Sequence, residues 1–232
     1  MAHATVTWVN FPPVERKLVH RWQGHPACEY GYRLQSNDDH RRELQELFKG
    51  FLHWLSRERK PVFLDVTLLA HAVKHHDDGE DFLGDDVLYV NKTGERDLLE
   101  YQAFKSVVEP HLVTSDWALL HRAFLLQFVR KYHSSTLFPS DAVLIMKDLS
   151  EMRWNEVLTF DCLERIDYLL YADEQERVLK NPHFICEVFP NQEPKLEDIF
   201  RLAPWLKGFY ESFSIHEKFQ KILREHGSLS VR

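Results

Sequence analysis

The chain has 232 residues, of which 44% are hydrophobic and 28% charged, and its 29 basic and 36 acidic side chains give a net charge of −7. Such a composition is typical of a globular protein with a sizeable core and disfavours disorder. The acidic excess argues against a nucleic-acid binder, which usually carries a basic face, and the longest apolar run is too short to span a bilayer.

Glycine and cysteine usage excludes several further classes. The 8 glycines are scattered singly, so no Gly-rich loop can cradle phosphates. Three distant cysteines provide neither a disulfide framework nor a thiolate zinc site. The first residues lack the charged and apolar regions of a secretory signal, so we expect a cytoplasmic, reducing location. The 14 histidines leave histidine-based chemistry open.

The N-terminal segment 1–35 is expected to be rich in strands. Residues 28–34 alternate between apolar and polar side chains, which is the pattern of a half-buried strand. Residues 5–11 predict a weaker edge strand before two prolines. At Ser36 the pattern changes, because a capping residue and two aspartates begin an amphipathic helix.

Helices dominate the expected body, residues 36–226. One should end near His76, and Ser115 should cap a buried central helix. Short strands are expected at 87–91 and 183–189. The remaining helices are expected at 95–109, at 140–150, at 159–179 with a break, and near the C-terminus. The sequence thus predicts an α+β fold, predominantly α-helical, in a single domain over 1–232.

The stretch 71–86 holds the densest polar chemistry in the chain. His71 and His75 are four residues apart, so on a helix they share one face and could share a metal ion. Asp77 and Asp78 follow at the helix end, where carboxylates could complete the site. A third histidine would have to come from elsewhere, and the candidates are His53, His111 and His121.

Two alternatives compete with that metal site. If the helix is buried on one face only, His71 and His75 point into solvent. The carboxylates that follow them are expected in a loop that could steer a basic partner. These partner-binding candidates are Asp77, Asp78, Glu80, Asp81, Asp85 and Asp86.

Two short motifs resemble known families. His76-Asp77 resembles the His-Asp doublet of HD-domain metal phosphohydrolases, which are also helical. That resemblance implies further ligands from an upstream helical histidine, such as His53, and a downstream aspartate, such as Asp161. Lys74 and His75 replace the apolar residues usual before the doublet. The run 77–81 also resembles the DDxxD motif of isoprenoid synthases, but no second such motif follows.

Two functions follow from these patterns. The first is a soluble, acidic protein–protein interaction module of the adaptor, inhibitor or immunity type, whose partner is a protein with a basic or mixed surface. Neither a nucleic acid nor a membrane is expected as its partner. The alternative is a helical hydrolase that depends on a divalent metal ion bound within residues 71–78.

Overall fold

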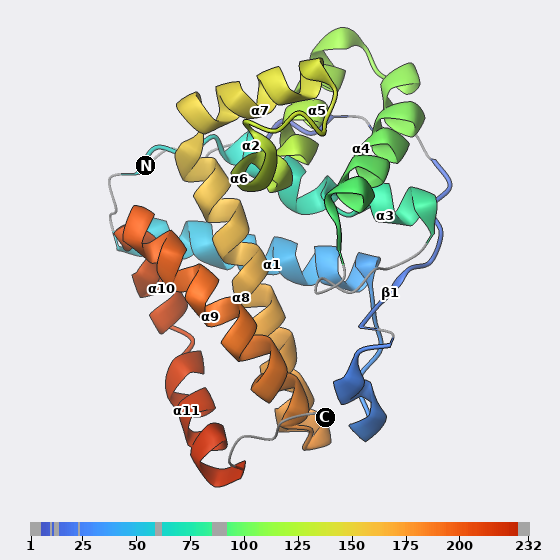
Figure 1. Ribbon diagram of the computed structural model, residues 1–232. Helices are drawn as coiled ribbons and strands as arrows, with labels where there is room; N and C mark the ends of the chain where they lie inside the picture. Colours follow the sequence, from blue (N-terminus) through green and yellow to red (C-terminus); the bar gives the residue numbers. More distant parts are fainter. Residues whose placement is uncertain are drawn as a thin grey trace.

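The computed structural model describes residues 6–9, 11, 14–22, 24–58, 62–84 and 92–226. Within this part helices dominate, and the sheet is one antiparallel pair, β1 and β2, in which His20 lies opposite Ser36 (Figure 1). The elements of the N-terminal half are β1 His20–Arg21, a 3-10 helix Pro26–Tyr30, β2 Gln35–Ser36, α1 Asn37–Arg57, α2 Val66–His75, α3 Asp78–Leu83, α4 Gly94–Val108 and a 3-10 helix Glu109–His111.

The C-terminal half is helical between short connections. Its elements are α5 Thr114–Leu125, a 3-10 helix Leu126–Phe128, α6 Val129–Tyr132, α7 Ser140–Met152, α8 Trp154–Leu179, α9 His183–Leu202, a 3-10 helix Pro204–Leu206, α10 Lys207–Glu211 and α11 Ile215–His226. None of the helices in the described part of the chain combines the length and the apolar character that crossing a bilayer requires.

Helix α1 begins where the sequence predicts it. The Ser36 side chain accepts from the Asp39 backbone N–H, and the Asp39 carboxylate accepts from the Ser36 backbone N–H, which is a complete capping box. The apolar stripe faces inward, since Leu44 and Phe51 are fully buried. This cap fixes the first turns of α1, on which the candidate site depends.

Three helices form the centre of the molecule. Helix α2 contacts α1, α5 and α8, and α8 also contacts α1. Helix α9 lies along α8, and α11 continues that layer (Figure 1). Buried aromatic side chains such as Phe104 and Phe124, whose ring centroids lie 3.9 Å apart, fill the space between the helices. Nearly all of the buried apolar residues, from Val9 to Ile222, belong to one contiguous cluster.

The strand expected at 28–34 is wrong. Pro26–Tyr30 forms a 3-10 helix capped by His25, and Gly31 follows with a φ of 86°. Tyr30 is exposed instead of lying on a buried strand face. A proline in the first turn and a positive φ at glycine both oppose an extended chain here. Of the edge strand expected at 5–11, the described residues form no strand.

Three further expectations need correction. Residues 183–189 are helical, because Phe184, Ile185 and Val188 bury one helical face in α9 against α8. Helix α8 runs without the expected break. Helix α5 begins at Thr114, one residue before Ser115, and no side chain caps it. The strand expected at 87–91 lies outside the described residues.

The acidic segment is not the expected loop. Residues Asp78–Leu83 form α3, and Gly84 ends that helix in the left-handed conformation. Helix α3 packs closely against α4, and a Cβ at Gly79 would lie 2.4 Å from the Glu100 carbonyl oxygen. The close approach places the carboxylates of this segment inside the molecule.

Candidate metal centre

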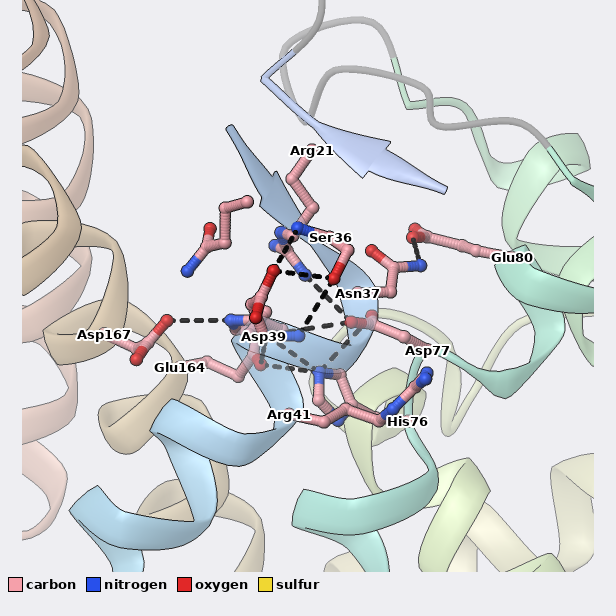
Figure 2. A network of polar contacts seen from close by, with 12 residues as sticks. Arg21, Ser36, Asn37, Asp39, Arg41, His76, Asp77, Glu80, Glu164 and Asp167 are labelled. Atoms are coloured by element: carbon pink, nitrogen blue, oxygen red, sulfur yellow. Dashed lines mark hydrogen bonds and ion pairs between the residues drawn. The ribbon is translucent and has the colours of Figure 1, made fainter. Parts of the chain in front are cut away.

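Three core helices position a buried polar cluster. His40 lies in the first turns of α1, His76 directly follows α2, and Glu164 lies in α8. The donor atoms of these three side chains lie close enough together to hold one metal ion, and among the described residues this is the group of His, Cys, Asp or Glu side chains that does so. Asp77 joins them from the turn after His76 (Figure 2). We call these four residues the ligand cluster.

The donor atoms of the ligand cluster face one another at short range. His40 Nε2 lies 3.1 Å from His76 Nε2 and 3.1 Å from Glu164 Oε1. His76 Nε2 lies 2.9 Å from the same Glu164 oxygen and 3.3 Å from Asp77 Oδ1. His40 Nε2 lies 3.7 Å from Asp77 Oδ2. Donors bound to one ion at about 2.1 Å lie about 3.0 Å apart in an octahedron and about 3.4 Å apart in a tetrahedron, so the cluster fits a shared ion.

The outer ring nitrogens of both histidines are held by acceptors. His40 Nδ1 lies 2.7 Å from Asp167 Oδ2, and His76 Nδ1 lies 3.1 Å from the Val73 carbonyl oxygen. A carboxylate and a carbonyl only accept, so each Nδ1 carries a proton. In neutral rings the Nε2 lone pairs then point into the ligand cluster. An acceptor behind the ring that fixes the tautomer is typical of metal-binding histidines.

The two buried carboxylates of the ligand cluster need a balancing positive charge. Burial opposes protonation of His76, but Asp77 and Glu164 raise its pKa to about 10. Burial and Arg21 likewise oppose protonation of His40, yet Asp167 and Glu164 raise its pKa. Although burial opposes ionisation, His76 holds the pKa of Asp77 and of Glu164 well below the usual range. Protons on the imidazoles or one divalent cation would balance this charge.

Arg21 closes one side of the ligand cluster. Its guanidinium donates to Asp77 Oδ2 at 2.8 Å (Figure 2). It also donates to the Tyr168 hydroxyl oxygen at 2.8 Å. The other oxygen of Asp77 faces His76. Arg21 is buried, so this charge-assisted bond holds Asp77 in one orientation.

A cavity of about 520 Å³ adjoins the ligand cluster, and Glu164 and Tyr168 belong to its wall. The Glu164 side chain is 15% exposed, whereas that of His76 is 3% exposed and that of His40 is fully buried. The cluster therefore meets the cavity through Glu164. The volume is typical of small-molecule sites. The cationic residues of the lining are Lys92, Arg130, Lys131, Arg165 and Lys195.

The acidic residues after Asp77 are ion-paired inside the molecule. Asp78 accepts from His75 at 2.8 Å and from Arg16 at 3.0 Å. Asp81 accepts from Arg41 at 2.6 Å. Burial raises the pKa of Asp81 to about 6, although Arg41 opposes the rise.

Glu80 completes this internal set, since it accepts from Lys92 at 2.8 Å and from the Asn37 amide at 3.2 Å. The four described carboxylates of the acidic segment, Asp77 to Asp81, are all buried and thus do not form an exposed acidic surface. Asp85 and Asp86 lie outside the described residues.

The predicted pair His71 and His75 is buried but lies outside the ligand cluster. His71 Nε2 lies 3.1 Å from the Thr7 carbonyl oxygen, and its ring meets Trp8 edge-on with centroids 5.1 Å apart. The His75 ring stacks on Phe11. We expected solvent or a metal on this face of α2, and the N-terminal segment covers it instead. Burial lowers the pKa of both histidines, which favours their neutral forms.

The residues considered as further ligands also lie elsewhere. His53 is exposed on α1, and His111 lies in the 3-10 helix after α4. His121 is buried beside Tyr101. Asp161 lines the cavity, where it is paired with two arginines.

Sequence reasoning therefore found His76 and Asp77 but missed three residues. His40, Glu164 and Asp167 were not singled out, because nothing local distinguishes them from other polar helix residues. One signal was available, since the i,i+3 spacing of Glu164 and Asp167 places both on one face of α8.

A comparison of the chain with family models, with curated proteins and with solved structures gives no match. The functional argument accordingly depends on the geometry of the ligand cluster and of its cavity.

Proposed function

We propose that the protein is a metal-dependent phosphohydrolase. The observation that carries the proposal is the convergence of His40, His76, Asp77 and Glu164 from three helices beside a cavity lined with cations. Two imidazole nitrogens and two carboxylates are donors that suit zinc, manganese or iron. The lysines and arginines of the cavity outnumber its carboxylates by five to four, and such cations can pair with a phosphate ester.

The order of these residues resembles that implied for HD-domain metal phosphohydrolases. His40 supplies the upstream helical histidine, His76-Asp77 the doublet, and α8 the downstream acid. One departure is that Glu164 faces the ligand cluster, while the aspartate, Asp167, contacts the far nitrogen of His40. Both acids of α8 therefore belong to the proposed site, Glu164 as a ligand and Asp167 as the partner of His40.

The proposed roles follow from the contacts. His40, His76, Asp77 and Glu164 would hold the ion, which would supply a Lewis acid and an activated water. Asp167 and the Val73 carbonyl keep the two rings in the tautomer that presents Nε2. Arg21 holds Asp77, and the burial of the histidines keeps bulk water away from their nitrogens.

The proposal is tested on tag-free protein by elemental analysis and by hydrolysis of p-nitrophenyl phosphate with added Mn²⁺. His40→Ala and His53→Ala form a matched pair, because both histidines lie on α1 but His53 is exposed. We expect near-stoichiometric metal in the wild type and in His53→Ala, and loss of metal and activity in His40→Ala.

Metal retained by a folded His40→Ala variant would contradict the proposal, as would a wild type that takes up no added Mn²⁺. Circular dichroism of each variant separates a lost site from a lost fold.

The interaction-module function remains an alternative proposal, but the fold limits the surface available to it. Asp77, Asp78, Glu80 and Asp81 are committed to internal partners. Such a module would have to rely on Asp85 and Asp86 or on a different surface. No observation on the described residues favours it over the metal site.

A further inference from the structure

The cavity beside the ligand cluster has an asymmetric distribution of charge. Lys92 lies within 4 Å of the carboxylates of Glu80, Glu100 and Asp97, so its charge is balanced locally. Lys131 lies 3.2 Å from Asp97. The part of the wall built by α6, α8 and α9 carries three further cations.

On that part of the wall two arginines share one carboxylate. Arg130 pairs with one oxygen of Asp161, and Arg165 lies 2.6 Å from the other. Lys195 adds a third cation to the same cavity. The carboxylate of Asp198, which also lines the cavity, is paired with Arg201 on its own helix. We call Arg130, Arg165 and Lys195 the cationic wall.

The cationic wall is held in place before any ligand arrives. Arg165 donates from Nη1 to the Gln192 side-chain oxygen at 2.7 Å, and its Nη2 atom pairs with Asp161. Partial burial and, after it, the neighbouring Arg165 cation lower the pKa of Lys195, while Asp161 opposes the change. Guanidinium groups that neighbouring side chains hold in this way are preorganised to pair with an anion.

The cationic wall lies close to the ligand cluster along α8. Asp161 and Glu164 are three residues apart and share one face of the helix, so their side chains start about 5–6 Å apart. One anionic group at the ligand cluster and another at the cationic wall would therefore be neighbours in the same molecule.

We propose that the cationic wall binds a second phosphate group of the substrate, so that the substrate class is a compound carrying at least two phosphates, such as a nucleoside diphosphate. This inference rests on the proposed function for the group hydrolysed at the ligand cluster. A cavity of about 520 Å³ has room for a nucleotide, and Tyr168 in its lining offers an aromatic contact.

The test measures binding rather than turnover, with AMP and ADP as probes that differ by one phosphate. Calorimetry is performed on tag-free full-length protein after EDTA treatment, and again after reloading with one equivalent of Mn²⁺ and removal of free metal. The variants are Arg165→Gln and, as a matched control, Arg122→Gln, because Arg122 forms an ion pair with Asp148 at 2.7 Å outside the cavity.

In the Mn²⁺-loaded wild type we expect ADP to bind about tenfold more tightly than AMP, since one charge-assisted contact is worth about that factor. Arg165→Gln should reduce this preference to within twofold, and Arg122→Gln should preserve it. In the EDTA-treated protein Arg165→Gln should weaken ADP binding about tenfold. If Arg165→Gln fails to fold, Lys195→Gln is expected to weaken ADP binding about threefold, because Lys195 also lines the cavity.

Equal binding of ADP and AMP by the loaded wild type would overturn the inference, and so would equal effects of Arg165→Gln and Arg122→Gln. The two proposals fail in different ways. A protein that takes up no metal but loses ADP binding in Arg165→Gln lacks the proposed function and keeps the anion site. A protein that binds metal and hydrolyses monophosphates without preferring ADP keeps the proposed function and refutes the second-phosphate site.

Discussion

Asp167 should control metal affinity without contacting the metal. Its Oδ2 atom lies 2.7 Å from His40 Nδ1, and its side chain is 6% exposed, so solvent does little to screen this contact. Asp167→Asn preserves the size of the side chain and an acceptor oxygen but removes the charge that supports the imidazole. Loss of such a partner typically weakens metal binding by about 10–100-fold, or about 1.4–2.7 kcal/mol.

Because asparagine can still accept from Nδ1, we expect Asp167→Asn to weaken Mn²⁺ binding by about tenfold. The assay is competition with a fluorescent metal indicator, which gives the Kd directly. Asp173→Asn is the matched control, because Asp173 lies on the same helix and is paired with Lys218 at 3.1 Å away from the ligand cluster.

A Kd for Asp167→Asn within twofold of the wild-type value would refute the assigned role of Asp167. An equal loss in Asp173→Asn would attribute the effect to α8 as a whole rather than to His40. Either result would remove the support that the Asp167 contact gives to the tautomer assigned to His40.

Three further predictions concern stability. His121 is 4% exposed, and burial lowers its pKa to about 4 from 6.5, so below pH 6.5 the unfolded chain binds a proton that the folded protein does not. The free energy of unfolding, measured with denaturant at pH 7.5 and at pH 5, should therefore fall by about 2 kcal/mol more in the wild type than in His121→Gln, and an equal fall in the two proteins would contradict the assignment. His71→Ala should cost about 1–3 kcal/mol, because His71 holds Thr7 and Trp8, but should leave the metal content unchanged. Loss of metal in a folded His71→Ala variant would instead support the metal site predicted at His71 and His75. Gly79→Ala should destabilise by about 2 kcal/mol or more, because its Cβ would meet the Glu100 carbonyl oxygen at 2.4 Å, whereas Gly50→Ala in open space on α1 should stabilise by about 0.5–1 kcal/mol. Similar melting temperatures for the two glycine variants would contradict the close approach of α3 to α4.

Local signals predicted local structure well. Ser36 and the aspartates after it predict the start of α1, because a capping box is complete within four residues. The apolar stripe that begins at Leu44 predicts the inward face of the same helix. By contrast, the alternation at 28–34 was misleading, since Pro26 and Gly31 decide the backbone there.

The strand expected at 183–189 failed for a related reason. A short apolar run that ends at a proline fits a strand or a buried helix equally well, and here α9 continues through Pro190. Packing against α8 decides between the two, and packing involves residues that are distant in the sequence.

The candidate site was only half predictable for the same physical reason. His76 and Asp77 are adjacent, so their motif is visible in the sequence. His71 and His75 form a regular pair, but what covers their face of α2 is the segment around Trp8, some 60 residues earlier. His40 and Glu164 can be recognised as members of the site only when the packing of α1 against α8 is known.

The packing of α1 against α8 has a consequence for folding during synthesis. His40 and Glu164 are 124 residues apart in the chain. During synthesis α1 and α2 leave the ribosome first and can dock early, but His40 then faces His76 and Asp77 before the two acids of α8 exist. The nascent N-terminal half thus holds only part of the ligand cluster, and the proposed ion would meet all four ligands only after α8 has been synthesised and has packed against α1 and α2.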